Sequence, residues 1–201
     1  MAKIKFTKNE LKTQRDALQR YQRYLPTLEL KKAQLQIEAG KIINSIQTKE
    51  EEKRKLRDYL DTWVRLFSED VDAGSYTYVK EVKQDINNIA GVSIPLCRKI
   101  IFERAPVDFF STPAWLDDGI DVLERLVQYR IELHFLYEQR RLLMEELLIT
   151  SQRVNLFEKI KIPETKENIR RIKIYLGDEH TSAVVRAKIA KEKSIETRGT
   201  L

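Results

Sequence analysis

Few residues in this chain have the type and spacing that catalysis or metal binding requires. Of the two histidines, His134 lies between Leu133 and Phe135, and His180 lies in a polar stretch. Neither has the paired spacing that zinc sites use, and one cysteine, Cys97, cannot build a thiolate site alone. Cys97 is expected to be a small packed side chain. The sequence therefore predicts no metal site.

Carboxylates are plentiful, but they are spread along the predicted helices. A catalytic pair of acids needs a cleft that raises the pKa of one of them. The chain also lacks a glycine-rich phosphate loop, a GxSxG turn and a DxDxDG calcium loop. We therefore expect no catalytic residues and no cofactor. The helices that carry these side chains are then more informative than the side chains themselves.

Composition and charge favour a charged, helix-rich protein. Charged residues make up 34% of the 201 positions, with only 6 glycines and 5 prolines. The net charge of +6 divides into +7 over residues 1–60, −4 over 61–163 and +3 over 164–201. Basic ends suggest an acidic neighbour, or simply solvated helix flanks. The sequence shows no secretory signal, disulfide framework or membrane-length apolar run, so a cytoplasmic location is expected.

Two long apolar stripes with a spacing of three and four residues occupy the two ends of the chain. Thirteen of seventeen positions in the first stripe are apolar or aromatic, against 42% for the chain. The first stripe consists of Leu11, Gln14, Leu18, Tyr21, Leu25, Leu28, Lys32, Leu35, Ala39, Ile42, Ile46, Lys49, Lys53, Leu56, Leu60, Trp63 and Phe67. The second consists of Val122, Leu126, Tyr129, Leu133, Leu136, Leu143, Leu147, Val154 and Phe157, with Arg140 and Thr150 as polar interruptions. Such stripes need a partner helix along their length, and each can serve the other.

Start and stop signals bound the two predicted helices. Thr7 and Glu10 form a capping box, so the first helix begins at Lys8 and runs to about Asp72, with a bend rather than a stop at Pro26. The second is expected to begin after Thr112 and run to about Lys161. Pro163 then interrupts it, and the stripe resumes at Ile169, Ile172 and Leu176. Residues 191–201 form a polar, frayed tail.

Glycine and proline gather in the middle of the chain. We expect a short helix over residues 76–88, with Val79, Val82 and Ile86 on one face. The segments 89–95 and 97–103 then read as a small β-hairpin, or alternatively as an irregular loop. The predicted fold is all-α in the main, a long antiparallel two-helix coiled coil with this central insert. Its parts are residues 1–72, 73–112 and 113–201.

Three lysines interrupt the first stripe. Lys32, Lys49 and Lys53 occupy seam positions, where a cation lowers the stability of a coiled coil. Their long side chains can extend to water from a two-helix seam. Alternatively, they mark a place where another subunit inserts.

Two segments of the chain resemble one known family. MAKIKFTKNELKTQRDALQRY is similar to the opening of the D subunit of the V-type and archaeal A-type ATPases. TSQRVNLFEKIKIPETKENIRRIKIYLGDEH, residues 150–180, resembles the family's C-terminal signature. The likeness covers both ends and the general layout. Pro26 and the segment GDEHTSAVVRAK, which lacks the usual basic cluster, depart from the family pattern.

The resemblance implies a rotor shaft with no catalytic site. It implies a central-stalk role in a cytoplasmic complex, coupling ATP hydrolysis or synthesis to proton or sodium transport through a membrane sector. The implied partners are a hexameric ring of catalytic and non-catalytic subunits, a small central-stalk subunit and a funnel-shaped connector to the membrane ring. No nucleic acid and no membrane span are expected. The alternative is a coiled-coil adaptor or a basic nucleic-acid-binding protein.

The resemblance also places candidate contacts at the two ends of such a shaft. The candidate contacts with the catalytic ring are Ile4, Phe6, Leu11, Arg15, Leu176, Val184 and Val185. The candidate lower-stalk contacts are Tyr59, Trp63, Arg65, Arg125, Arg130 and Arg141.

Overall fold

The computed structural model describes residues 4–61, 73–107, 112–113 and 115–199. Its contacts divide the chain into two units. The first unit joins Met1–Leu30 to Thr150–Leu201, and the second is Lys31–Ile149. Within the described residues, no helix is apolar enough over a sufficient length to cross a membrane.

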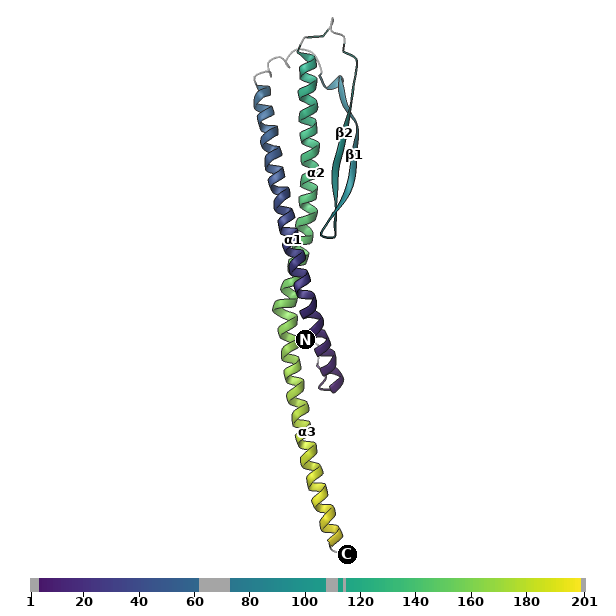
Figure 1. The fold of residues 1–201 in the computed structure, drawn as a ribbon, viewed down its shortest axis with the longest axis vertical. Helices are drawn as coiled ribbons and strands as arrows, with labels where there is room; N and C mark the ends of the chain where they lie inside the picture. Colours follow the sequence, from purple (N-terminus) through teal and green to yellow (C-terminus); the bar gives the residue numbers. More distant parts are fainter. Residues whose placement is uncertain (1–3, 62–72, 108–111, 114, 200–201) are drawn as a thin grey trace. The chain divides into compact units, whose positions relative to one another are not determined.

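In chain order a β-hairpin separates two long helical stretches, as the sequence predicts, and in Figure 1 it lies along the second of them. In chain order the elements are α1 (Lys8–Asp61), the short 3-10 turn η2 (Ala73–Ser75), β1 (Thr77–Ile89), β2 (Val92–Arg104), α2 (Leu116–Asn155), the π-helix η3 (Leu156–Lys161) and α3 (Ile162–Gly199). The predicted fold class is confirmed.

Helix α1 begins at its predicted cap. The Glu10 backbone N–H donates a 3.2 Å hydrogen bond to the Thr7 hydroxyl, which satisfies one free donor of the first turn. The helix continues through Pro26, so the expectation that this proline does not stop it is confirmed, and the bend stays a prediction. Its predicted end at Asp72 lies outside the described residues, which give the helix as far as Asp61.

The predicted short helix over residues 76–88 is wrong, because that segment forms strand β1. The two short strands predicted at 89–95 and 97–103 are likewise wrong in their limits. The hairpin is confirmed, but it pairs β1 with a single strand β2, from Thr77 opposite Arg104 to Ile89 opposite Val92. The turn between them holds only Ala90 and Gly91, both at positive φ, as two-residue hairpin turns require.

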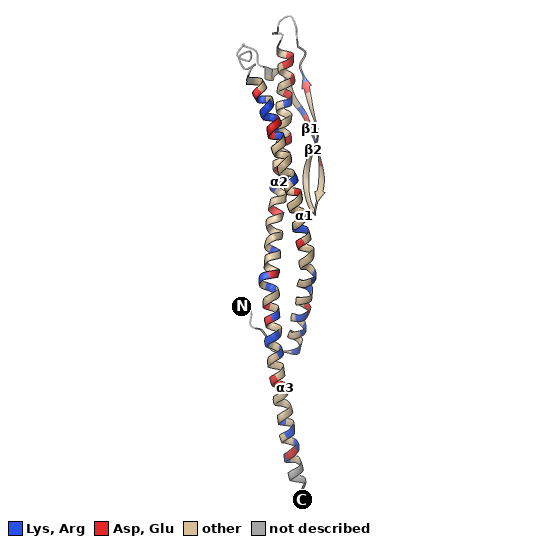
Figure 2. Cartoon of the chain, turned by 60° about the vertical axis from the view of Figure 1, so that its left-hand side comes forward, with Lys and Arg blue, Asp and Glu red and all other residues tan. Residues whose placement is uncertain are grey.

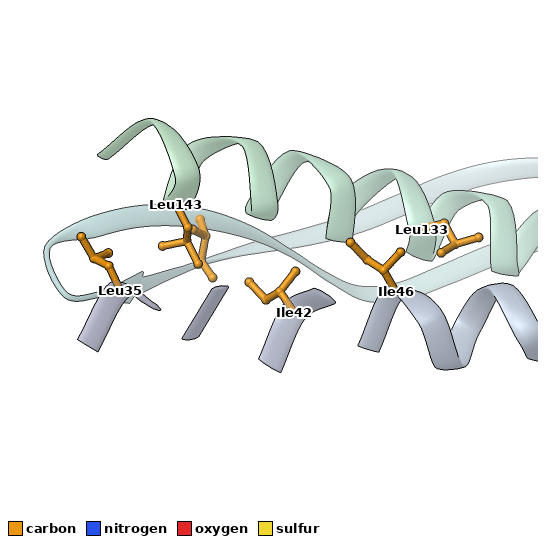
Figure 3. Close-up of a cluster of buried hydrophobic side chains, with 6 residues drawn as sticks. Leu35, Ile42, Ile46, Leu133 and Leu143 are labelled. Carbon is orange, nitrogen blue, oxygen red and sulfur yellow. The ribbon is translucent and has the colours of Figure 1, made fainter. Parts of the chain in front are cut away.

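The core of the second unit lies where three elements meet. Leu35, Ile42 and Ile46 of α1 lie with Leu133 and Leu143 of α2 and with Ile94 of β2 (Figure 3). Leu35 and Leu143 are completely buried. The hairpin therefore contributes to the core, which an isolated two-stranded sheet needs in order to be stable in water. The ion pairs Lys31–Glu146 and Lys49–Glu132 show that α1 and α2 run antiparallel here.

The first unit is also an antiparallel pairing of helical segments. The Tyr21 and Phe157 rings lie 5.2 Å apart, and the Phe6 and Tyr175 rings lie 5.0 Å apart. Between these two contacts, Ile172 is completely buried.

The start of the second helical stretch differs from the prediction. Helix α2 begins at Leu116, whose N–H bonds to the Pro113 carbonyl, rather than directly after Thr112. The stretch remains helical to Lys161, as expected, but its last six residues form the π-helix η3. The predicted interruption at Pro163 is wrong, because α3 follows η3 directly and the helical stretch continues through the proline. Helix α3 extends to Gly199, so the predicted fraying of the tail has no support in the structure.

Candidate interaction surfaces

The two groups of predicted contact residues fall in different units. All seven candidate ring contacts belong to the first unit, and all six candidate lower-stalk contacts belong to the second. Trp63 and Arg65 lie outside the described residues. Contact of these residues with a partner stays a prediction. The structure shows which of the described ones are exposed and which residues lie next to them.

The second half of α3 is an exposed helical segment. Every residue from Gly177 to Ser194 is exposed, in contrast to the buried Ile169 and Ile172 before it. Val184 and Val185 are 54% and 51% exposed, and they lie about 12 Å along the helix from Leu176. Apolar side chains held in water on a charged helix are suited to contact with another molecule.

The remaining candidate ring contacts lie around the start of α1. Phe6 packs its ring on Tyr175, the residue next to the half-buried Leu176. Ile4 and Leu11 are half-buried, and Arg15 is exposed. The structure thus brings Phe6 beside the part of α3 that holds Leu176, while Val184 and Val185 lie further along that helix.

Three of the described lower-stalk candidates present cations on α2. Arg125, Arg130 and Arg141 are exposed. Arg141 is held on its own helix by Glu138 at 2.7 Å and Glu145 at 3.2 Å. The hydrogen bond between Arg141 and Glu138 raises the pKa of Arg141 and lowers that of Glu138. Tyr59 is exposed near the end of α1.

Arg130 borders a hollow surface between α1 and α2, which we term the basic groove. Two adjoining hollows of about 470 and 510 Å³ share Lys53, Arg57 and Arg130. The lining of the basic groove comprises Glu50, Lys53, Arg54, Arg57 and Leu60 of α1 with Leu123, Leu126, Val127, Arg130, Leu133, His134 and Tyr137 of α2. Figure 2 colours the lysine and arginine positions along the ribbons of α1 and α2 blue.

The charge of the basic groove is largely unneutralised by the described residues. Tyr137 donates a hydrogen bond to Glu50, which raises the pKa of Tyr137 and occupies that carboxylate. No ion pair with another described residue engages Lys53, Arg54, Arg57 or Arg130. Lys53 is one of the three seam lysines, and it faces this groove.

Lys49, another seam lysine, is satisfied within the unit. Its ammonium lies 3.1 Å from Glu132 and 3.2 Å from Glu52, and 5.2 Å from the centre of the Tyr129 ring. The hydrogen bond to Glu132 is the largest cause of its raised pKa. Lys49 therefore reaches a carboxylate at the edge of the seam, as extension to water predicts.

A separate hollow of about 470 Å³ lies beside the hairpin. Leu96 and Cys97 of β2 line it together with Lys49, Phe135 and Gln139. Burial raises the pKa of the Cys97 thiol, which favours its protonated form. This agrees with the expectation of a packed cysteine.

Long-range pairings that the sequence pattern did not reveal attach the hairpin to α2. At its open end, Arg104 bonds Glu124 through Nε at 2.7 Å and Asp121 through Nη2 at 2.6 Å, while the Thr77 hydroxyl donates to Glu124 at 2.9 Å. Near the turn, the buried Gln139 amide donates to the Pro95 carbonyl at 2.6 Å. Only the finished pairing of β1 with β2 brings these groups together, so the chain order gives no local signal for them.

In the described part of the chain, no group of three or more His, Cys, Asp or Glu side chains is placed to hold a metal ion. Its hollows are lined by helix and strand side chains without a convergent set of catalytic groups.

Known proteins are similar to nearly the whole of this chain. The sequence model for the ATP synthase D subunit matches residues 10–192. The chain is 50% identical to the V-type ATP synthase D subunit of Borreliella burgdorferi, over 98% of this chain and 97% of that protein. It is 35% identical to the protein of the same name from Chlamydia caviae, over 96% of this chain and 94% of that protein.

Proposed function

The chain belongs to the ATP synthase D subunit family, and on this basis we propose that it is the non-catalytic central-stalk shaft of a V-type rotary ATPase. In this role it transmits torque between ATP hydrolysis or synthesis in a ring of catalytic and non-catalytic subunits and proton or sodium transport through a membrane sector. It works as a peripheral part of the complex on the cytoplasmic face of the membrane.

The observation that carries the proposal is the 50% identity to a V-type ATP synthase D subunit over nearly the whole of both chains. The helices are of the kind that a shaft needs. Helix α1 is continuous over 54 residues, and in each unit part of it pairs antiparallel with a second helical segment. Two packed helices resist twisting better than one, because turning one against the other breaks side-chain packing along the seam.

We place the contact with the catalytic ring on the first unit. The exposed segment 177–194 of α3 carries Val184 and Val185 among charged residues, and the aromatic pair Phe6–Tyr175 lies before it. A shaft that turns inside a ring meets a sequence of different surfaces. Small apolar side chains among dispersed charges provide contact without a single tightly specific anchor.

We place the contact with the small central-stalk subunit on the second unit, in the basic groove. Its floor holds Leu123, Leu126 and Leu133, and its rim holds Lys53, Arg57 and Arg130. An amphipathic helix with apolar residues on one face and carboxylates at its edges has the chemistry that fits such a surface. The exposed Tyr59 lies near the end of α1, where a funnel-shaped connector would follow.

Reversible cross-linking of α3 to the ring tests the torque role. In a Cys97→Ser background, Val185→Cys is labelled with a cleavable photo-cross-linker and assembled into the complete ATPase. We expect ATP hydrolysis to fall in proportion to cross-linking and to return when the linker is cleaved. Tyr78→Cys on the hairpin, which is also exposed, is the control and should leave hydrolysis unchanged. Undiminished hydrolysis after complete cross-linking at Val185 would overturn the shaft assignment.

Co-purification separates this proposal from a nucleic-acid-binding or adaptor role. The tagged full-length chain should recover ATPase ring subunits from its own cells at moderate salt, because the shaft is enclosed by the ring. Recovery of DNA or RNA under these conditions, without an ATPase partner, would instead favour the nucleic-acid role.

A further inference from the structure

The π-helix η3 coincides with a shift of one residue in the buried stripe of the first unit. Before η3, the stripe runs through Thr150, Val154 and Phe157, at intervals of four and three. The same rhythm continued would bury positions 161, 164, 168, 171 and 175. The structure instead buries Thr165, Ile169 and Ile172 and half-buries Leu176, each one residue later, while Glu164 and Arg171 are exposed.

A π-turn accounts for a shift of this size and direction. The Ile162 N–H donates to the Phe157 carbonyl, five residues back, where an α-helix would use the residue four back. A π-turn therefore holds one more residue than an α-turn. Every side chain after it is rotated back about the helix axis by about 100°, the angle that one residue occupies in an α-helix. Both flanking residues, Asn155 and Ile162, have right-handed helical φ and ψ, so the helix passes through without a break.

The same neighbour receives the stripe on both sides of η3. Before η3, the Phe157 ring lies on Tyr21 of α1. After η3, the half-exposed Tyr175 ring, next to the stripe residue Leu176, lies on Phe6, just before α1. If the same residues were wound as ordinary α-helix, without the wider turn of η3, the side chains turned toward this neighbour would be Glu164 and Arg171 instead of Thr165 and Ile172. Burying a charged side chain without a partner is unfavourable, so the unshifted phase is disfavoured.

We propose that η3 is a phase-correcting turn: it absorbs one surplus residue so that the apolar face of α3 stays against α1, and it thereby fixes the angular position of the exposed segment 177–194. Pro163 explains why the surplus is absorbed here. Its ring needs room at the carbonyl of Lys159, four residues back, and that carbonyl lies inside the wider turn. The phase correction is a property of the helix pair and stands whether or not the chain turns inside a ring.

Single-residue deletion and insertion test this proposal, because the two have opposite consequences for a turn that holds one residue too many. All variants and their parent carry Pro163→Ala, so that the proline ring does not oppose an ordinary α-turn at the Lys159 carbonyl. In this background, deletion of the exposed Glu158 lets η3 become ordinary α-helix and leaves an unbroken three–four stripe. We expect the full-length variant to unfold within about 2 °C of the parent. One alanine inserted between Glu158 and Lys159 adds a second surplus residue, turns Ile169 and Ile172 out of the seam, and should lower Tm by about 10 °C.

A deletion elsewhere provides the matched control. Removing the exposed Gln152, upstream of η3, puts Asn155 and Glu158 in the places of Val154 and Phe157 whether or not the π-turn relaxes. This variant should therefore lose stability as the insertion does.

Amide hydrogen exchange gives a local measurement. In the Glu158 deletion, the amides of residues 165–176 should keep the parent's protection, and in the insertion they should exchange at least 10-fold faster. Equal losses of protection in both variants would overturn the proposal, since an ordinary helix is disturbed equally by either change. A Gln152 deletion as stable as the Glu158 deletion would also overturn it.

Discussion

At the scale of single residues, the contact with the clearest pH dependence joins Arg104 to Glu124. The Glu124 side chain is only 14% exposed, and the hydrogen bonds from Arg104, helped by Thr77, lower its pKa despite its burial. A carboxyl group whose pKa is lower in the folded state stabilises the fold above its unfolded pKa, about 4.3, and the contribution is lost as pH falls through the folded value.

We therefore predict that Glu124→Gln lowers the free energy of unfolding at pH 7 by about 1 kcal/mol, a modest value because Arg104 is 46% exposed. As the pH falls from 5 to below the folded pKa of Glu124, the free energy of unfolding of the parent should approach that of the variant, because residue 124 then carries no charge in either protein. Urea unfolding across this pH range measures the difference in free energy of unfolding between parent and variant. Glu138→Gln, at an exposed ion pair with Arg141, is the control and should change stability less. A gap that stays constant down to pH 3 would contradict the assignment.

Substitution by alanine should change stability in opposite directions at two glycines, Gly91 and Gly40. Gly91 has φ of +84°, and an added Cβ would be 3.9 Å from Lys31 Nζ, so the difficulty for alanine is backbone strain rather than collision. Gly40 lies inside α1, with nothing within 4 Å of such a Cβ. Gly91→Ala should cost roughly 1 kcal/mol, and Gly40→Ala should stabilise by roughly 0.5 to 1 kcal/mol. Thermal unfolding of both variants checks the signs, and a stabilising Gly91→Ala would show that the turn is not strained.

At the scale of elements, the sequence predicts the long helices well and the hairpin poorly. The helical stripes are local and repeat many times, so no distant contact is needed to recognise them. Strand β1 resembled a helix because Val79, Val82 and Ile86 stand three and four residues apart. The strand has register shifts between Val79 and Glu81 and between Lys83 and Gln84, and each shift breaks the two-residue alternation of an ordinary strand. Pairing with β2, which decides the conformation, is not visible in the segment itself.

The buried hydrogen bond from Gln139 to the Pro95 carbonyl should hold the hairpin against α2. Gln139→Leu removes the donor and leaves that carbonyl without it, at a cost of about 1 to 3 kcal/mol. Because a two-stranded sheet alone is marginal, we expect amide exchange to quicken across β1 and β2 while α1 and α2 keep their protection. Gln47→Leu, at an exposed position of α1, is the control. If amide exchange in the hairpin is unchanged, the apolar contacts of Ile94 hold the hairpin against α2 without this hydrogen bond.

At the scale of the whole molecule, the sequence predicts which parts are exposed better than it predicts what they touch. Val184 and Val185 are apolar residues in a charged segment, and the structure shows them exposed. The sequence draws attention to Arg130 and Lys53 but not to the basic groove that they line. The apolar lining of that groove brings Leu60 of α1 together with Leu126 of α2, more than sixty residues later in the chain. Contact with a partner depends on that partner's surface, which neither sequence nor fold of one chain contains.

The uneven charge of the chain gives the prediction that belongs to the whole molecule. The first 60 residues carry +7 and the last 38 carry +3, while the part between them carries −4. If these basic ends meet an acidic lining in the ring, replacing Lys3, Lys5, Lys8, Arg186 and Lys188 by Glu should weaken assembly with the ring. The chain's net charge then changes from +6 to −4.

The salt dependence of this loss distinguishes attraction from misfolding. The screening length falls from about 30 Å at 0.01 M salt to about 10 Å at 0.1 M, so the deficit in assembly should be large at low salt and shrink as salt is added. The same five-fold reversal at exposed positions of the second unit, Lys41, Lys55, Lys83, Arg98 and Lys99, produces the same net charge and should weaken ring assembly less. Binding of labelled chain to purified rings across a salt series measures both. If assembly is indifferent to the reversal at every salt concentration, the basic ends do not guide the chain into the ring, and packing of residues such as Val184 and Val185 must do so alone.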